Sequence, residues 1–163
     1  MWEGRFLAVK KDGNWEYAER KGDIGAAVIV ALAGEDVLLV EQFRTPVNHR
    51  CLELPAGLVG DDGESETVAD AACRELEEET GYRAGAVEEL GEFLSSPGMT
   101  SERFTVVRAT ELTQVSDGGG TGEEDIIIHR VPLTGVAAFI NEKRAAGFGI
   151  DAKLLLLLSL EMF

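Results

Sequence analysis

The chain has 163 residues, with 15 Lys and Arg against 30 Asp and Glu, which gives a formal net charge of −15 at pH 7. A surface of that sign repels polyphosphate backbones and anionic lipid, so nucleic-acid and membrane partners are disfavoured. Hydrophobic residues make up 45% of the sequence, which is enough for a sizeable core. We therefore expect a single domain over residues 1–163.

Cysteine content and the N-terminal sequence both bear on the compartment. Cys51 and Cys73 are the two cysteines, and they do not form a CxxC pair. The first residues, MWEGRFLAVKKDG, lack the long apolar run of a signal peptide. Both features favour a reduced, cytoplasmic location. The most apolar run, Leu154–Leu160, is well short of the roughly 20 residues that span a bilayer, and it predicts a buried C-terminal helix.

The first third of the chain predicts a hairpin followed by core strands. Apolar and polar residues alternate on both sides of the turn Asp12-Gly13-Asn14, which indicates a hairpin reaching to about Arg20. Two β-branched runs follow at 26–32 and 37–41, separated by a turn. The segment CLELPAGLVGDDGESE then predicts a short strand and a loop rich in glycine and acid.

A helix is predicted from about Thr67 to Gly81. Thr67 and Asp70 make a capping box, and Gly81 suits the C-cap. At 100° per residue one stripe of this helix is apolar and should face the core, and it consists of Val68, Ala69, Ala72 and Leu76. Beyond the helix we expect a strand, a Ser-Pro-Gly loop, a strand over 104–109, a glycine-rich loop, a strand IIIHRVPL, and helices around 135–146 and 151–163.

The predicted helix concentrates like charge, because CRELEEETGYR has four glutamates in five positions. Glu75, Glu78 and Glu79 lie along one edge of the apolar stripe, and Glu77 points to the opposite side. Glu75 and Glu79 are spaced i,i+4, where like charges cost about 0.2–0.5 kcal/mol. A divalent cation would turn this repulsion into attraction, since Mg²⁺ prefers carboxylate oxygens. The alternative interpretation is a solvated helix face.

These acids belong to a longer spaced pattern, which is Gly60, five residues, Glu66, seven residues, and then RELEEETGY. The pattern resembles the signature of the Nudix hydrolases. The resemblance implies an α/β (α+β) fold, the Nudix α/β/α sandwich with a mixed central sheet, and Mg²⁺ as cofactor with Mn²⁺ as the alternative. It implies these metal ligands: Glu75, Glu79, Glu78, the carbonyl of Ala56, and Glu66 in the outer shell. Arg74 would lie near Glu77 and Glu78 and orient the carboxylates, the alternative being an ordinary surface ion pair.

Further segments resemble the ADP-ribose pyrophosphatase branch of that family: VLLVEQFRTPV, LELPAGLV, FLSSPGMTSERF and GEEDIIIHRV. In that branch a proline follows the signature, as Pro97 follows Gly81 here. The resemblance implies Mg²⁺-dependent hydrolysis of ADP-ribose to AMP and ribose 5-phosphate. The alternatives are hydrolysis of another nucleoside diphosphate sugar such as GDP-mannose, and a non-catalytic nucleotide sensor. Dimers of this branch exchange N-terminal strands, so residues 1–22 are expected to contribute to a homodimer.

The resemblance also assigns residues to the two ends of the substrate. Arg44 would contact the diphosphate or the terminal ribose phosphate, because a guanidinium fork matches phosphate geometry. Glu102 would lie near the metal and the terminal ribose. Trp15 or Tyr17, with Arg20 nearby, would supply a face on which adenine stacks, and the predicted substrate loop adds Pro97, Gly98 and Met99. The alternatives are a strand-end surface arginine for Arg44, a loop carboxylate for Glu102 and a hairpin-packing residue for Trp15.

Hydrolysis needs activated water, and in this branch a glutamate on the loop before the last strand is placed in that role. The loop here is GGGTGEEDI, in which Glu123 is the first candidate and Glu124 the second. The glycines at 118–120 suit a loop that closes over substrate.

Overall fold

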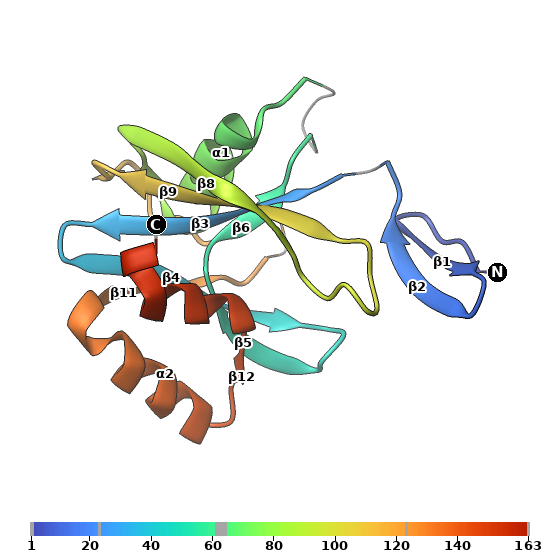
Figure 1. The fold of residues 1–163 in the computed structure, drawn as a ribbon. Helices are drawn as coiled ribbons and strands as arrows, with labels where there is room; N and C mark the ends of the chain where they lie inside the picture. The colour runs from blue at the N-terminus through green and yellow to red at the C-terminus, as the bar shows by residue number, and fades with distance from the viewer. Residues whose placement is uncertain (1, 23, 61–64, 123, 163) are drawn as a thin grey trace.

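The computed structural model describes residues 2–22, 24–60, 65–122 and 124–162, with side chains up to residue 157 in the last range. In this part of the chain, an eight-stranded mixed sheet has β12-β5-β4-β3-β9-β8 as its main path, with β11 paired to β4 and β6 to β3 (Figure 1). The pairs β3·β9 and β5·β12 are parallel and the others antiparallel. The strands of this sheet are β3 (Ala26–Ala33), β4 (Asp36–Arg44), β5 (His49–Glu53), β6 (Ala56–Leu58), β8 (Ala86–Leu94), β9 (Arg103–Thr110), β11 (Ile127–Pro132) and β12 (Gly149–Ile150).

The sheet separates two hydrophobic clusters, because successive residues of a strand point to opposite faces. In β3, Val28 belongs to one cluster and Ile29 to the other. Helix α1 (Val68–Thr80) covers the second cluster, into which it packs Ala72 and Leu76. The first cluster is covered by α2 (Val136–Ala145), which follows the short turn η1 (Leu133–Gly135), and by η2 (Ala152–Met162). The expected α/β/α sandwich is therefore confirmed (Figure 1).

Helix α1 begins and ends where the sequence predicts. Thr67 is the N-cap, and its hydroxyl accepts a hydrogen bond from the Asp70 backbone N–H at 3.1 Å. Gly81 ends the helix in a left-handed conformation (φ 73°) that favours glycine, and its N–H donates to the carbonyl of Glu77. A two-stranded pair, β7 (Tyr82–Arg83) with β10 (Thr113–Gln114), follows the helix. These contacts fix the helix that carries the signature acids.

The C-terminal segment differs in part from the prediction. Residues 152–162 form a 3₁₀ helix, where the sequence predicted a buried C-terminal helix without specifying its type. With three residues per turn, Leu154 and Leu157 fall on the same side and are buried, while Leu155 is 62% exposed. Residue 163 lies outside the described residues.

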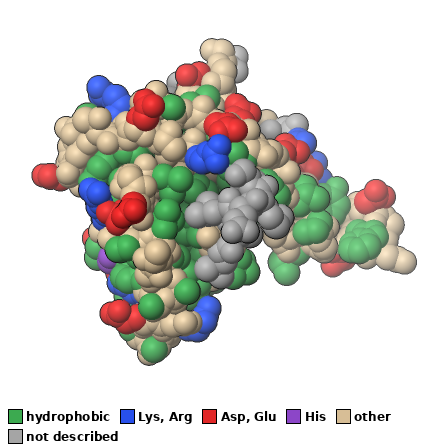
Figure 2. Space-filling model, turned by 60° about the vertical axis from the view of Figure 1, so that its left-hand side comes forward, with side chains coloured by type: hydrophobic (Ala, Val, Ile, Leu, Met, Phe, Trp, Pro, Cys, Tyr) green, Lys and Arg blue, Asp and Glu red, His purple; other side chains and the backbone are tan. Residues whose placement is uncertain are grey.

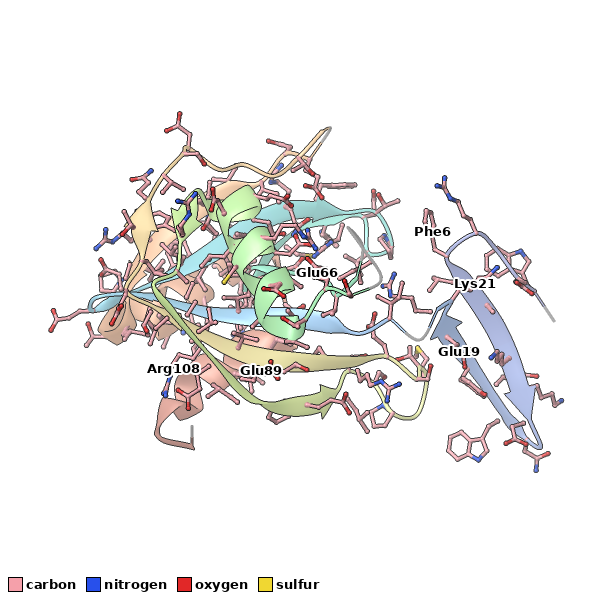
Figure 3. The ribbon with its side chains drawn as sticks, turned by 90° about the horizontal axis from the view of Figure 1, so that it is seen from above. Phe6, Glu19, Lys21, Glu66, Glu89 and Arg108 are labelled. Carbon is pink, nitrogen blue, oxygen red and sulfur yellow. The ribbon has the colours of Figure 1, made fainter. Side chains whose placement is uncertain are left out.

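The N-terminal hairpin, β1 (Leu7–Asp12) and β2 (Trp15–Arg20), turns where the sequence predicts, with a two-residue loop, since Asp12 pairs with Trp15. It stands apart from the rest of the molecule (Figures 1 and 3). The Ala18 N–H donates to the Met99 carbonyl at 2.9 Å. Hydrophobic side chains gather on the projecting hairpin (Figure 2), and Trp2, Phe6 and Trp15 are among those more than 60% exposed. Among the described residues, no helix has the length and apolar character needed to cross a membrane.

Candidate functional site

A cleft of about 930 Å³ lies where α1 meets the loop after β5 and the edge of the sheet. Its described lining combines six carboxylates with three cationic side chains, so its charge is negative overall. The carboxylates are Glu53, Glu75, Glu79, Glu102, Glu124 and Asp151, and the cations are Arg20, Arg44 and Lys153. The sequence-predicted residues Ala56, Arg20, Arg44, Glu75, Glu79, Glu102 and Glu124 are thus brought together.

Glu75 and Glu79 are the acids of α1 that turn into the cleft. Glu79 is buried, and burial together with the charge of Glu75 raises the pKa of Glu79 to about 8. The Ala56 N–H, which donates to Glu79 Oε2 at 3.1 Å, and Arg44 act in the opposite direction. Burial also raises the pKa of Glu75. The pair is therefore electrostatically unfavourable without a positive charge in the cleft.

Gly57 gives Glu75 the room to enter the cleft. A Cβ atom at position 57 would lie 1.8 Å from Glu75 Cδ and 2.0 Å from its Oε1, far inside van der Waals contact. A side chain at position 57 would therefore displace the Glu75 carboxylate from its present position. Gly57 therefore lets β6 pack closely against the side of α1 that carries Glu75.

Arg74 binds three acids at once. Its Nη1 donates to Glu75 at 2.7 Å and to Glu78 at 3.3 Å, and its Nε donates to Glu66 at 2.9 Å. The expected position near Glu78 is therefore observed, and the contact with Glu75 comes in addition to it. Glu77, the other acid expected near Arg74, is hydrogen-bonded to Arg83.

Glu77 and Glu66 have different partners from Glu75 and Glu79. Glu77 pairs with Arg83 at 3.0 Å on the outer side of the helix. Glu66, which lies alongside α1 in Figure 3, accepts from the Gly60 N–H at 2.7 Å and from Arg74. The hydrogen bond from Arg74 lowers the pKa of Glu66. Both carboxylate oxygens of Glu66 are thus in use, which suits an orienting role and leaves direct ligation to other acids.

The glycine-rich loop is tied to the C-terminal end of α1. The Gly119 and Gly120 N–H groups donate to the carbonyls of Glu79 and Glu78 at 2.9 and 3.0 Å. A Cβ at Gly118 would lie 2.4 Å from the Thr80 backbone, so close approach requires this glycine. The absence of side chains thus lets the loop backbone approach the end of α1, where carbonyl groups without intrahelical partners need hydrogen-bond donors.

Beyond these glycines the loop brings Glu124 to the cleft. Its Oε2 accepts from the Thr121 N–H at 2.8 Å. The charge of Glu124 contributes to the raised pKa values of Glu75 and Glu79, so the three carboxylates lie within electrostatic range of each other. Glu123, the first candidate for water activation, lies outside the described residues.

Two arginines line the cleft, Arg44 at the end of β4 and Arg20 at the end of the hairpin strand β2. Arg44 Nε and Nη2 both donate to the buried Glu53, each at 2.7 Å. Arg20 Nη2 donates to Glu102 at 3.1 Å, whereas its Nε is buried and has no partner in the described structure. A buried donor without an acceptor is rare, and this one points to a bound acceptor.

The remaining predicted residues lie elsewhere in a single chain. Trp15, Tyr17, Pro97 and Gly98 line a separate hollow of about 380 Å³ between the hairpin and the β8–β9 loop. Met99, in the same loop, is 66% exposed. The expected stacking residues therefore do not reach the acidic cleft of their own chain.

Some cleft residues have no clear sequence signal. Asp151 and Lys153 pair at 2.6 Å at the start of η2, far along the chain from the signature. Glu53 alternates with Leu52 and Leu54 in the segment LELPAG, so the sequence indicates that its side chain is on the opposite face of the strand from the two leucines. The sequence does not indicate its partner. A distant strand pairing decides that it meets Arg44.

The donor set fits a hard divalent cation. Within the described chain, no three His, Cys, Asp or Glu side chains are gathered closely enough to hold an ion in their present conformation. The cleft nevertheless has an excess of carboxylates, and one of them, Glu79, is held buried beside another. Oxygen donors of this kind suit Mg²⁺ or Mn²⁺. Glu75, which accepts from Arg74 through Oε1, is the second carboxylate next to Glu79.

Comparison with known proteins gives a consistent family assignment. The model of the NUDIX domain matches residues 23–139. Methanol dehydrogenase activator of Bacillus methanolicus is 34% identical over 122 residues, which are 74% of this chain and 64% of that protein. ADP-ribose pyrophosphatase of Bacillus subtilis is 35% identical over 104 residues, 63% and 55% of the two chains. GDP-mannose pyrophosphatase of Pectobacterium atrosepticum is 32% identical over 146 residues, 85% and 72% of the two.

The matched segment spans between about half and two-thirds of the length of the first relatives. Among solved structures, one titled "Crystal structure of ADP compounds hydrolase" superposes with a TM-score of 0.70 at 21% identity. The match covers 96% of this chain and 91% of that one. At that identity the likeness shows the fold alone.

Proposed function

The chain belongs to the Nudix family, and on that premise we propose that it hydrolyses the diphosphate bond of ADP-ribose, giving AMP and ribose 5-phosphate, with Mg²⁺ as cofactor. The observation that carries the proposal is the pair of the buried Glu79 and the partly buried Glu75 in a cleft that also presents Arg44 and Arg20. Carboxylate oxygens bind divalent cations such as Mg²⁺, and guanidinium groups bind phosphate. A diphosphate bound with metal satisfies both sets.

In this proposal the acids of α1 hold the cofactor. Glu75 and Glu79 are its ligands, with Glu78 and the Ala56 carbonyl completing the set, and Mn²⁺ is the alternative ion. When bound, the ion supplies positive charge that polarises the diphosphate and lowers the pKa of water. Arg74 donates to Glu75 and orients its carboxylate, and Glu66 in turn orients Arg74 by accepting from its Nε.

The substrate lies between these acids and the sheet. Arg44 transfers its two N–H donors from Glu53 to a phosphate, for which its fork geometry is suited. The buried Nε of Arg20 donates to an acceptor of the substrate, and Glu102 accepts a ribose hydroxyl. Adenine stacks on Trp15 or Tyr17 near Pro97, Gly98 and Met99. Because Trp15 lines a different hollow from the cleft of its own chain, we propose that a homodimer brings it to the partner's site.

Water is activated by a carboxylate of the loop before β11. Glu124 lines the cleft and is within electrostatic range of Glu75 and Glu79, which supports it as the general base. Glu123 remains the other candidate. Separate E124Q and E123Q variants distinguish the two, since the true base should lose most of its kcat with little change in KM.

Another nucleoside diphosphate sugar is the second candidate substrate. The match to the GDP-mannose pyrophosphatase of P. atrosepticum covers 85% of this chain, whereas the match to the ADP-ribose pyrophosphatase of B. subtilis covers 63%. A non-catalytic nucleotide sensor is disfavoured by the neighbouring Glu75 and Glu79, because binding without hydrolysis gives no reason to keep two repelling carboxylates. Substrate comparison decides among these candidates.

The decisive experiment measures products by chromatography after incubation with ADP-ribose or GDP-mannose, with Mg²⁺ or with chelator. E79Q tests the metal assignment, because it keeps the shape of the side chain and removes the charge. E77Q is the matched control, since Glu77 lies on the outer side of the same helix and pairs with Arg83. We expect AMP from ADP-ribose with Mg²⁺, loss of turnover in E79Q, and full turnover in E77Q. Unchanged Mg²⁺ dependence and turnover in E79Q would rule out the assignment.

A further inference from the structure

The loop that presents Glu124 is fixed at its beginning by α1, as described above, and it closes on itself. The Ile126 N–H donates to the Gly119 carbonyl at 3.3 Å, and the Glu124 N–H donates to the Thr121 carbonyl at 3.2 Å. Ile126 is buried, so the loop returns to the core immediately after Glu124 and Asp125. The Glu124 carboxylate is thus placed by the shape of one short loop.

The end of this loop is held by Arg50, a residue of β5. Arg50 Nη1 donates to Asp125 Oδ2 at 2.9 Å, and Nη2 donates to the Asp125 carbonyl oxygen at 3.2 Å. The guanidinium of Arg50 therefore donates hydrogen bonds to both the side chain and the backbone of Asp125, the residue next to Glu124. Asp125 is otherwise open, with 79% of its side chain exposed. An ion pair with so exposed a partner contributes little to stability, so stability alone does not account for this contact.

Arg50 is itself held by a rigid support inside the sheet. Its Nε donates to Glu41 Oε1 at 2.7 Å, and the Glu41 side chain is only 6% exposed. The other oxygen of Glu41 accepts from Lys143 Nζ at 2.7 Å and lies 3.0 Å from His129 Nε2. Three cationic or polar groups from β5, β11 and α2 thus converge on one buried carboxylate. Arg50 is therefore bonded to the sheet through Glu41 and to the loop through Asp125.

We propose that Arg50 is a positioning residue, which fixes Asp125 and thereby aims the carboxylate of Glu124 at Glu75 and Glu79. The inference rests on the proposed hydrolytic function, in which Glu124 is the general base. The proposal adds to the site a residue of β5, which lies outside the signature. A base that is misplaced by about 1 Å can lose on the order of a hundredfold in rate.

The test compares R50M with R130M. Arg130 lies on β11 and donates through Nε to Asp36 of β4, so R130M removes a similar strand-to-strand ion pair at the opposite end of β11 from the loop. We expect R50M to lower kcat for ADP-ribose by about ten- to hundredfold with little change in KM, and R130M to leave kcat near the wild-type value. R50K should fall between, because lysine keeps the charge and loses the fork.

A double variant tells positioning from a general structural effect. If Arg50 acts through Glu124, R50M should change kcat by less than about twofold in an E124Q background, because the group that it aims is already gone. A full additional loss in that background would overturn the proposal. So would equal effects of R50M and R130M on kcat.

Hydrogen exchange of the loop keeps this test separate from the proposed function. Arg50 should protect the Gly119 and Thr121 amides, so R50M should speed their exchange and R130M should not. If wild-type protein hydrolyses no nucleoside diphosphate sugar, the proposed function fails, and faster exchange in R50M alone still supports the anchoring of the loop. Unchanged exchange in R50M would overturn the anchoring, whatever the activity.

Discussion

Gly57→Ala is expected to damage the site while sparing the fold. Gly57 is not among the residues with positive φ, so its backbone accepts alanine. The new Cβ would, however, lie 1.8 Å from Glu75 Cδ, whereas carbon atoms in contact are about 3.5 Å apart or more. The Glu75 carboxylate must therefore move by roughly 1.7 Å. A shift of that size away from β6 stretches or breaks its 2.7 Å bond with Arg74.

The magnitudes predict a modest stability change and a large functional one. A hydrogen bond between charged groups contributes about 1.5–3 kcal/mol. The loss is offset by about 0.4–1 kcal/mol, because alanine restricts the unfolded chain more than glycine does. We expect a net destabilisation of about 1–2 kcal/mol, which lowers Tm by several degrees at this chain length. Displacement of a metal ligand by more than 1 Å should reduce kcat/KM by about a hundredfold or more.

The assay combines thermal unfolding, with and without Mg²⁺, and turnover of ADP-ribose. Gly135→Ala is the matched control, because the nearest atom to its added Cβ is 4.0 Å away and Gly135 has φ −100°. The control should behave as wild type in both measurements. G57A should retain a cooperative transition and lose the rise in Tm that we expect Mg²⁺ to produce in the wild-type protein. Wild-type turnover and a wild-type Mg²⁺ effect in G57A would refute the idea that Glu75 needs the space left by Gly57 to enter the cleft.

Three further changes test the scaffold around the site. R74M leaves Glu66 and Glu75 without their shared cation at a mostly buried position, so urea unfolding should show a loss of about 3–5 kcal/mol, part of which Mg²⁺ restores. Burial alone would raise the pKa of Glu41, but hydrogen bonds from Lys143, His129 and Arg50 outweigh it and bring the pKa to about 2. Because this value is below that of the unfolded chain, Glu41 stabilises the fold above about pH 4.5 and the contribution disappears as pH falls towards 2. It amounts to about 3 kcal/mol, and E41Q should flatten the corresponding slope of unfolding free energy against pH. L76A should cost about 2–5 kcal/mol in the same urea assay, since Leu76 is fully buried.

Local signals in the sequence predicted much of the fold. Thr67 and Asp70 form the expected capping box, and Gly81 ends α1 in the left-handed conformation. The hairpin turn and the two core strands also agree with the prediction. These features depend on residues a few positions apart, so periodicity and turn chemistry are sufficient to find them. The 3₁₀ form of residues 152–162 was missed because a run of leucines has no polar positions to reveal its period.

The site was predicted where its members share one helix, and missed where they come together across the sheet. Glu75, Glu78 and Glu79 follow from helical spacing. The partners of Arg44 and Arg50 follow instead from the register of β4 against β5, which places Phe43 opposite Arg50 and Arg44 opposite His49. That register also puts the acids Glu53 and Glu41 within reach of the two arginines. Periodicity within one segment cannot specify such pairs.

The glycine-rich loop shows most clearly why composition leaves a role open. The glycines at 118–120 predict a loop that closes over substrate, since glycine permits large backbone rotations. The same residue type also permits close backbone approach, and the structure shows that approach. Gly119 and Gly120 reach the end of α1, and Gly118 has no room for a side chain. Because the carbonyls that they satisfy belong to Glu78 and Glu79, the acids of the helix and the acid of the loop are set by the same contacts. Gly118→Ala should therefore disturb both at once, whereas a hinge would tolerate the change wherever the left-handed conformation of φ 64° could be kept.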